Sequence, residues 1–461
     1  MTLEPAPTRG IDRGAFLRRA AALAAAPTLL ATPAVADAHR RHGRPWWHGD
    51  WRLPAHDLAG RRETDRGPRG LAVRWRAPMA GGVTGAPLAA DGVAVAASLG
   101  GEVAAFDLHD GRERWRVAFP PAVYGTAPDT VALGFFGGAA IARDRVVVAS
   151  DRVRCLRLRD GATVWEADPL RGADDDDYFW GPPVIAAGLV LVGSGAGSEA
   201  TATRGRVSAY ELGHGGLAWS TPMVPEGGNG GGVLAPVTVD LRLGSAFAAT
   251  GSPYVPQAAD VPGTSSLVEL ALRDGSVRFT DQVHPGDALG LDFNSAPVLA
   301  GGVIGATAKD GVWAWSRRSR RRLWHVQLTP ATPAGGGTAG PTNGPEGGPI
   351  AADDGAFYVL SNDEPRGVSV AAAISRRSGR VRWRTDLGGF TFAAPAVAGR
   401  WLVASTASGD LEVLRTRDGR SVARVPLGGP SAGAVAAADR RLLVGVGAEP
   451  FLPGGELVCL G

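Results

Sequence analysis

Lysine and cysteine are nearly absent from this chain. Its 461 residues contain one lysine, Lys309, among 48 basic residues, and two cysteines, Cys155 and Cys459. Two cysteines cannot build a disulfide framework, and their positions match no Cys-x-x-Cys metal pattern, so we expect two small buried side chains. With 48 basic and 45 acidic residues, the net charge is only +3, which argues against a general polyanion binder and against nucleic acid as a partner.

Several other common features are missing. After the N-terminal region no uncharged apolar stretch reaches the length of about 18 residues that a membrane span needs, so we expect no span. The chain has no G-x-S-x-G nucleophile motif, no phosphate-binding loop in a strand-to-helix context and no closely spaced histidine pair for a metal. Glycine and proline are abundant, at 67 and 34 residues. They interrupt helices and favour many short strands joined by turns, which argues against an all-helical protein.

Residues 1–38 predict an exported protein. Arg13 to Arg19 supply positive charge, and Ala20 to Ala31 form an apolar run that is too short to span a membrane. The small residues of the run 34–38 offer cleavage sites, so the segment has the pattern of a secretory signal peptide, with an amphipathic helix as the alternative. It resembles a degenerate twin-arginine signal in which Gly14 occupies the place of the second arginine. We therefore expect a periplasmic, cell-wall or extracellular protein.

A repeat runs through the rest of the chain. In each copy an Asp-Gly pair, or a near equivalent, precedes a tryptophan or its substitute by four residues, and the copies are spaced by 40 to 60 residues. The glycine positions of the seven complete copies are Gly111, Gly161, Gly215, Gly275, Arg320, Gly379 and Gly419. An eighth copy begins at the end of the chain, and its missing tryptophan is available as Trp75.

About four short alternating runs, bounded by turn residues, lie in each repeat. This predicts an all-β fold, an eight-bladed β-propeller of four-stranded antiparallel blades. Residues 71–78 should supply the outer strand of the last blade beside residues 455–461, which closes the ring and covers exposed strand edges. The expected organisation is a signal peptide at 1–38, an N-terminal extended segment at 39–70 and the propeller at 71–461.

The repeated tryptophans have a structural explanation. A flat indole can stack between neighbouring blades, and its N–H can donate to a carbonyl of the next blade. We therefore expect these residues to hold the ring together and not to take part in chemistry.

The pattern Ala-x-Asp-x-x-x-Gly-x-x-x-Trp resembles the tryptophan-docking motif of the pyrroloquinoline-quinone-binding-like repeat family. The resemblance is to eight-bladed quinoprotein dehydrogenases of the polyvinyl alcohol and methanol type. It covers about residues 50–461 and is most specific over 230–324. Those enzymes oxidise alcohols with pyrroloquinoline quinone (PQQ) and a metal ion, so the resemblance implies PQQ with calcium or a lanthanide. At the level of repeats the chain also resembles the propeller lipoprotein of the outer-membrane assembly machinery, but no lipobox cysteine follows the signal.

The resemblance also implies metal and cofactor residues. Glu199 precedes an Arg-Gly pair, as one metal ligand does in the family, and Asp292 matches an additional aspartate of the lanthanide-using relatives. Ser252 stands where a metal-binding asparagine is usual, and a hydroxyl is a poorer ligand for a hard cation. Lys309 matches the cation that contacts the quinone carbonyls, whereas Leu234 replaces the tryptophan on which the quinone lies.

The catalytic base of the family is replaced as well. Gly290 stands at its position, and glycine cannot accept a proton. The remaining candidates for a base are Asp287 and Asp292.

Each of these residues also has a structural interpretation. Glu199 and Asp292 are alternatively solvated loop carboxylates, Lys309 a surface side chain beside a turn, and Asp287 the cap of a turn. We interpret the basic run Arg317 to Arg322 as a solvated turn.

These substitutions favour an exported, quinone-binding-like propeller that is a non-catalytic binding or scaffold protein of the cell envelope. The alternative is a divergent PQQ- and metal-dependent alcohol dehydrogenase. Accordingly, the expected partner is an envelope protein, a polymer or a small alcohol. The dehydrogenase alternative requires Lys309 and Asp292 to lie close enough to reach one cofactor and its ion.

Overall fold

The computed structural model describes residues 49–126, 129–169, 177–197, 203–254, 260–287, 289–330, 344–345, 350–447 and 454–461. The chain divides into two compact units, Met1–Trp46 and Trp47–Gly461, and every described residue belongs to the second. The predicted signal peptide and Glu199 lie outside the described residues. Within the described part, no helix has the length and hydropathy to cross a membrane.

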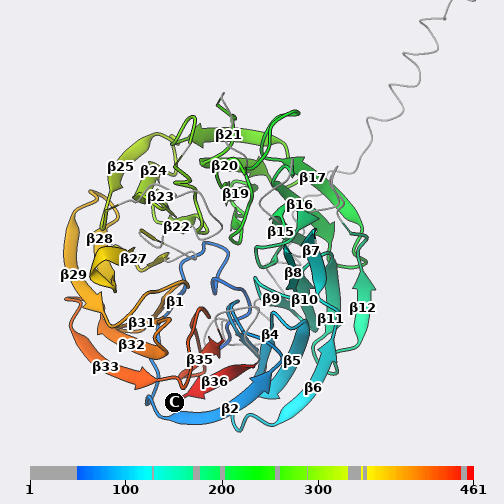
Figure 1. Cartoon of the computed structure of the whole chain (residues 1–461), viewed down its shortest axis with the longest axis vertical. Helices are drawn as coiled ribbons and strands as arrows, with labels where there is room; N and C mark the ends of the chain where they lie inside the picture. The colour runs from blue at the N-terminus through cyan, green and yellow to red at the C-terminus, as the bar shows by residue number, and fades with distance from the viewer. Residues whose placement is uncertain are drawn as a thin grey trace, which may run out of the picture. The chain divides into compact units, whose positions relative to one another are not determined.

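Eight antiparallel sheets of four strands follow one another around a ring, with the first strand of each blade innermost (Figure 1). The structure therefore confirms the predicted eight-bladed, all-β propeller. Blade 1 consists of β3 (Leu88–Ala90), β4 (Val93–Ala97), β5 (Glu102–Asp107) and β6 (Glu113–Ala118), and blade 2 of β9 (Ala139–Ala142), β10 (Arg145–Ala149), β11 (Val153–Arg157) and β12 (Thr163–Glu166). Blade 3 consists of β14 (Val184–Ala186), β15 (Leu189–Ala196), β16 (Arg206–Glu211) and β17 (Leu217–Pro222), and blade 4 of β18 (Thr238–Asp240), β19 (Ser245–Ala249), β20 (Ser266–Ala271) and β21 (Val277–Gln282). Blade 5 consists of β22 (Val298–Ala300), β23 (Val303–Ala308), β24 (Gly311–Ser316) and β25 (Arg322–Val326), and blade 6 of β26 (Ile350–Ala352), β27 (Ala356–Asp363), β28 (Val368–Ser375) and β29 (Val381–Leu387). Blade 7 consists of β30 (Ala396–Ala398), β31 (Trp401–Ser405), β32 (Asp410–Arg415) and β33 (Ser421–Pro426), and blade 8 of β34 (Ala436–Ala438), β35 (Arg441–Val446), β36 (Gly455–Leu460) and β2 (Val73–Met79).

A few short elements lie outside this pattern. The two-residue strands β1 (Glu63–Thr64) and β13 (Asp177–Tyr178) extend the sheets of blades 7 and 3. The hairpin of β7 (Ala122–Thr126) and β8 (Asp129–Leu133) follows blade 1 in the sequence, and its Tyr124 packs against Tyr178 of β13. A single turn of 3-10 helix, Glu364–Arg366, follows β27.

The last blade is closed by a strand from the other end of the propeller. β2 pairs antiparallel with β36, in a register that places Val73 opposite Leu460 and Met79 opposite Gly455. The predicted closing strand is thus confirmed, and the outer edge of β36 is paired along its whole length.

Six indole side chains bridge neighbouring blades. Each indole Nε1–H donates to a backbone carbonyl of the following blade over 2.7–3.2 Å, and the pairs are Trp75 to Leu108, Trp115 to Leu158, Trp165 to Leu212, Trp219 to Leu272, Trp324 to Arg376 and Trp383 to Thr416. The glycine of the repeat provides the room for each ring. At Gly161, for example, φ is +72° and a Cβ atom would lie 2.6 Å from the indole of Trp115. A side chain at this position would therefore be strained in its backbone and would collide with the ring.

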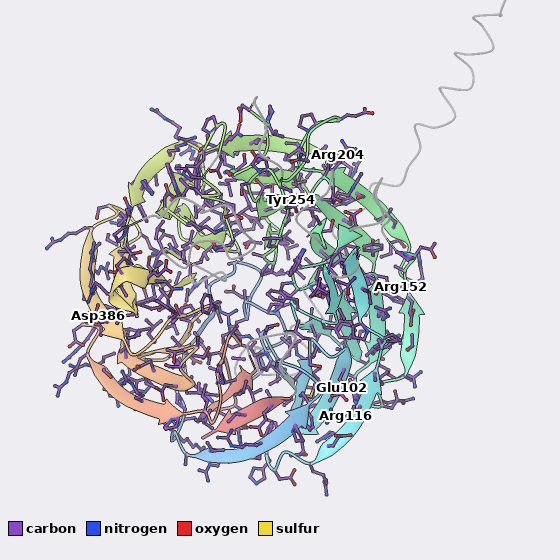
Figure 2. The ribbon with its side chains drawn as sticks, viewed as in Figure 1. Glu102, Arg116, Arg152, Arg204, Tyr254 and Asp386 are labelled. Carbon is purple, nitrogen blue, oxygen red and sulfur yellow. The ribbon has the colours of Figure 1, made fainter. Side chains whose placement is uncertain are left out.

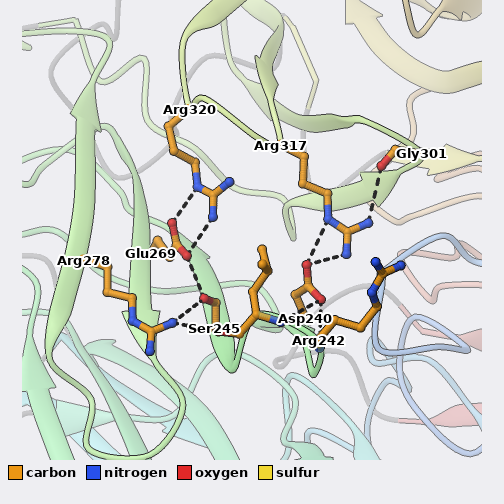
Figure 3. Close-up of polar contacts among 9 residues, drawn as sticks. Asp240, Arg242, Ser245, Glu269, Arg278, Gly301, Arg317 and Arg320 are labelled. Carbon is orange, nitrogen blue, oxygen red and sulfur yellow. Dashed lines mark hydrogen bonds and ion pairs between the residues drawn. The ribbon is translucent and has the colours of Figure 1, made fainter.

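The boundary between blades 4 and 5 is ionic instead. Phe279 and Arg320 occupy the tryptophan and glycine positions there, and Arg320 binds the buried Glu269 of blade 4 through Nε and Nη2, at 2.6 and 2.8 Å (Figure 3). Arg317 and Arg322 bind two further carboxylates of blade 4, those of Asp240 and Asp281. The interpretation of Arg317 to Arg322 as a solvated turn is therefore wrong for Arg317 and Arg320, whereas Arg322 is paired but stays exposed. The carboxylates that bind them come from strands far away in the sequence.

The segment before the propeller lies inside the ring (Figure 1). Among the described residues, its backbone groups bind the innermost strand, or the residue directly after it, in seven blades, and the contacts are Trp51 with Ala89, Arg52 with Ile141, Leu58 with Val239, Ala59 with Leu299, Arg61 with Ala352, Arg62 with Val397 and Gly49 with Asp439. All these contacts lie near the ends of the innermost strands, and so they occupy one end of the axial channel. Residues 49–64 therefore tie seven blades together at that end.

Arg62 is the most deeply buried charge in this segment. Its guanidinium donates to the carbonyl oxygens of Pro395, Val435 and Pro54 and lies over the indole of Trp51. Burial lowers the pKa of Arg62 to about 9, so the side chain remains charged at neutral pH. Three carbonyl acceptors are what makes a fully buried guanidinium tolerable.

Both cysteines are buried and unpaired, as predicted. Burial raises the pKa of each thiol, Cys155 and Cys459, to about 12. Neither is therefore a reactive thiolate at neutral pH.

Candidate functional site

The candidate residues that the structure describes lie on connections at one face of the ring. In an antiparallel blade, the connection between the second and third strands lies at the same edge as the connection to the next blade. Ser252 and Lys309 follow the second strands of blades 4 and 5, whereas Leu234, Asp287 and Asp292 lie between consecutive blades. This face is opposite the end of the channel that residues 49–64 occupy.

Backbone hydrogen bonds join these connections in series. Gly205 donates to Gly230, Gly231 to Ser252, Gly251 to Gly232, Phe293 to Thr250, and Lys309 to Asp292, over 2.8–3.3 Å. The loops of blades 3, 4 and 5 thus form one continuous wall at the axial mouth, although they are separated by about fifty residues each in the sequence.

Lys309 and Asp292 form an ion pair in this wall. The Lys309 Nζ atom lies 3.2 Å from Asp292 Oδ1, and each side chain is 16% exposed. The alternatives of a surface lysine and a solvated aspartate are therefore wrong. Burial raises the pKa of Asp292; the Lys309 charge opposes this shift, and the nearby Asp287 carboxylate adds to it.

Asp287 is engaged in a turn. Its Oδ1 atom accepts the backbone N–H groups of Leu289 and Leu291, at 3.2 and 3.1 Å, and its Oδ2 atom accepts the hydroxyl of Ser265 at 2.9 Å. These contacts are the ones that the turn-capping alternative predicts. Gly290 lies inside the turn with φ +65°, a conformation that favours glycine.

Leu234 lies beside a tyrosine that sequence reasoning missed. The Tyr254 hydroxyl accepts the Ala196 N–H at 3.1 Å, and a Cβ atom on Gly232 would lie 2.3 Å from that hydroxyl and 3.4 Å from Leu234 Cδ2. Figure 2 marks Tyr254 on the strand connection of blade 4. Glycines at 195 and 232 thus leave room for a phenol against the aliphatic side chain.

Ser252 is held in the wall by its backbone carbonyl, which accepts the Gly231 N–H. Glu199 falls outside the described residues, so its role stays a prediction. Among the residues that the structure describes, no three His, Cys, Asp or Glu side chains are grouped so as to hold a metal ion.

A second polar cluster lies next to Lys309. Asp310 Oδ2 lies 2.9 Å from His284 Nε2 and 3.3 Å from His325 Nε2, and its Oδ1 atom accepts the Trp313 indole N–H at 3.0 Å. Burial acts to raise the pKa of Asp310, but the hydrogen bonds from His284, His325 and Trp313 outweigh it and hold the pKa far below its ordinary value. The cluster fastens the connection before β22 to the turn that carries Lys309. Only the Lys-Asp-Gly run could have marked Asp310 in the sequence, because its partners are distant.

The sequence profile of the family described as "Outer membrane protein assembly factor BamB" matches residues 71–204 and 308–460, more than half of the chain. Among curated proteins, the quinohemoprotein alcohol dehydrogenase ADH IIB of Pseudomonas putida is 27% identical over 260 residues, which are 48% of this chain and 36% of that protein. The outer membrane protein assembly factor BamB of Alkalilimnicola ehrlichii is 38% identical over 106 residues, 23% of either chain. The matched part thus spans about a third or less of the length of these relatives.

Solved structures are similar over most of the chain. The quinohemoprotein alcohol dehydrogenase of Comamonas testosteroni superposes with a TM-score of 0.77 at 18% identity, covering 92% of this chain and 82% of that one. A europium-containing methanol dehydrogenase gives 0.73 at 15% identity, covering 90% and 98%. BamB of Moraxella catarrhalis gives 0.57 at 15% identity, covering 85% and 97%. At these identities the similarity establishes the fold alone.

Proposed function

The chain belongs to the family of PQQ-like propellers described as outer membrane protein assembly factor BamB, and from this premise we propose that it is a non-catalytic binding or scaffold protein of the cell envelope. The axial mouth formed by blades 3 to 5 is its binding site. Export is supported by the predicted signal peptide and by the envelope role that the name of the BamB relatives states. The partner class stays an envelope protein, a polymer or a small alcohol.

One observation carries the proposal: neither candidate carboxylate is free to act as a base. Asp292 is ion-paired with Lys309, Asp287 accepts hydrogen bonds from a hydroxyl and two backbone amides, and Gly290 has no side chain. Loss of a general base commonly costs about 10²–10⁴-fold in rate. A site arranged in this way can bind a molecule but is poorly equipped to take a proton from it.

The described residues do not fit a complete quinone site of the kind that the resemblance implies. Leu234 offers no aromatic face, and Ser252 offers a hydroxyl in place of an amide oxygen. Lys309 already has a carboxylate partner, and Asp287 adds negative charge beside it. An anionic quinone would therefore have to displace the existing pair.

The second candidate is a divergent PQQ- and metal-dependent alcohol dehydrogenase. The short distance between Lys309 and Asp292 favours it, since both could reach one cofactor and its ion. Burial also raises the pKa of Asp292, which is the direction in which a carboxylate becomes a stronger proton acceptor. For this candidate to hold, Lys309 would have to exchange Asp292 for the cofactor.

Reconstitution distinguishes the two candidates. The purified exported protein is mixed with PQQ and either calcium or lanthanum, and dye reduction is followed with primary alcohols, secondary alcohols and polyvinyl alcohol. An active quinoprotein alcohol dehydrogenase serves as the positive control, and the Asp292→Asn and Lys309→Met variants are assayed in parallel. We expect no alcohol-dependent dye reduction by any form of the protein. Turnover that both substitutions abolish would overturn the proposal in favour of the dehydrogenase.

A further inference from the structure

One position recurs around the axial mouth in the seven blades for which the structure describes it. This position lies on the connection that enters the blade, six residues before the last residue of the innermost strand. The pairing of the first two strands shows which residue ends the innermost strand in each blade, and so makes the positions comparable. Among the described residues this position is occupied by Thr84, Phe136, Trp180, Leu234, Asn294, Phe392 and Ala432. Leu234 is therefore one member of a ring of equivalent residues, and an aromatic side chain stands one blade before it.

The neighbouring connections pack directly against each other at this level. A Cβ atom on Gly137 would lie 2.7 Å from the Trp180 carbonyl oxygen, and one on Gly181 would lie 2.9 Å from the Ala235 carbonyl oxygen. The Thr84 hydroxyl donates to the Phe136 carbonyl at 2.8 Å. The positions of blades 1 to 4 therefore form a continuous arc.

Trp180 is held in a fixed orientation within this arc. Its Nε1–H donates to the Ala196 carbonyl at 2.7 Å, and the rings of Phe136 and Tyr178 pack edge to face with it, at centroid distances of 5.2 and 4.9 Å. The indole nevertheless stays partly exposed, and Phe136 is 38% exposed. A rigid, partly exposed indole at a mouth is a surface on which a flat apolar face can stack.

Trp180 is linked to the ion pair by the same wall. Ala196 accepts from Trp180 and donates to the Tyr254 hydroxyl, which lies against Gly232. Gly232 in turn accepts the Gly251 N–H, and a Cβ atom on Gly251 would lie 3.5 Å from Asp292 Oδ2. Trp180 and Asp292 thus lie on one continuous series of contacts, with glycine backbone between them.

The charged residues at the mouth favour a neutral ligand. Lys309 and Asp292 neutralise each other, and Asp287 adds a carboxylate whose oxygens accept three hydrogen bonds. An anionic ligand would meet the Asp287 and Asp292 carboxylates, and a cationic one would compete with Lys309 for Asp292. A neutral molecule with one apolar face and several hydroxyl groups satisfies both the indole and the carboxylate.

We propose that the axial mouth binds a neutral glycan, one of whose sugar rings stacks on Trp180 while its hydroxyl groups donate to Asp292. This inference rests on the proposed binding function and names the ligand class of the same site. The polymer alternative among the partners becomes a polysaccharide.

The test uses two neutral oligosaccharides, cellotetraose and tetra-N-acetylchitotetraose, with the full exported protein in isothermal titration calorimetry. We expect saturable binding of at least one of them, weakened at least tenfold by Trp180→Leu, which installs the side chain that blade 4 carries at the equivalent position. The matched control is Trp401→Leu, because Trp401 lies at the start of β31, near the opposite end of the channel from the mouth, and this change should leave binding unaltered.

If Trp180→Leu fails to fold, Trp180→Phe retains packing while reducing the stacking area, and saturation-transfer NMR on the wild-type protein reports which sugar ring protons contact the protein. Absence of binding to both oligosaccharides, or binding that Trp180 substitutions leave unchanged, would overturn the glycan inference. The dye-reduction assay is scored separately: alcohol turnover refutes the non-catalytic proposal, whereas no turnover together with no glycan binding refutes the ligand class alone.

Discussion

Arg320 of blade 5 binds both carboxylate oxygens of Glu269 of blade 4, at a boundary where Phe279 and Arg320 replace the repeated tryptophan and glycine. Burial acts to raise the pKa of Glu269, but the hydrogen bonds from Arg320 and Ser245 outweigh it and lower the pKa. Paired, hydrogen-bonded charges of this kind hold a boundary only while both partners are present.

Removing one partner of this pair should therefore be costly. We expect Arg320→Ala to lower the free energy of unfolding by about 3 kcal/mol, because it leaves the Glu269 carboxylate buried without its cation. Urea denaturation measures the change, and Arg318→Ala, at an exposed arginine of the same turn, should stay within about 0.5 kcal/mol of wild type. The double variant Arg320→Gly/Phe279→Trp restores the repeat and should recover part of the loss. Equal effects of Arg320→Ala and Arg318→Ala would contradict this account.

The glycine beneath each indole should be sensitive for two separable reasons. We expect Gly161→Ala to destabilise by more than Gly92→Ala, although both glycines have similar positive φ values of +72° and +74°. A Cβ atom at Gly92 meets nothing within 4 Å, so that variant reports backbone strain of about 1–2 kcal/mol alone. At Gly161 the collision with Trp115 adds to this strain. If the two variants lose the same stability in thermal unfolding, the Trp115 indole moves to accommodate the added Cβ atom and the collision adds nothing.

Acid should weaken the cluster beside Lys309. A carboxylate whose pKa is depressed in the folded state stabilises the fold above its unfolded pKa, and this contribution is lost as pH falls. For Asp310 the contribution is therefore present at neutral pH and declines below about pH 4, its ordinary range. We expect the stability difference between wild type and Asp310→Asn to be largest near pH 6–7 and to shrink towards pH 3. Asp354→Asn, at a side chain that is 95% exposed, should show no such trend.

Residues 49–64 should hold the blades together less well if the buried Arg62 guanidinium is removed. Arg62→Met leaves the carbonyls of Pro395, Val435 and Pro54 without a donor, and we expect a loss of about 3 kcal/mol or more in unfolding free energy. Arg66→Met, at an exposed arginine of the same segment, is the control. Amide hydrogen exchange of the innermost strands would localise the effect. If their protection from exchange is unchanged in Arg62→Met, this segment does not hold the blades together.

The fold could be predicted because the repeat encodes it locally. Most copies place a glycine and an indole at a fixed spacing, and the contact between the glycine of one blade and the indole of the blade before it sets how neighbouring blades pack, as between Gly161 and Trp115. The ionic boundary was not predictable in the same way. Arg317 and Asp240 are 77 residues apart, and nothing local distinguishes a paired arginine from a solvated one.

Only part of the candidate site could be predicted from the sequence. The order of the connections already places Ser252, Asp292 and Lys309 on one face, since alternate turns of a blade share an edge. Whether Lys309 pairs with Asp292 depends on a 3.2 Å contact that no spacing rule supplies. Trp180 was missed because its equivalence with Leu234 becomes visible only once the ends of the innermost strands are known.

The pairing of β2 with β36 has a consequence for biosynthesis. The two strands are separated by nearly the whole propeller, so seven blades emerge from the ribosome before the partner of β2 exists. Until then β2 is an unprotected edge that can pair with another chain. A nascent molecule must therefore be kept apart from its neighbours until the last strand is synthesised, and a stalled or truncated chain should aggregate through that edge.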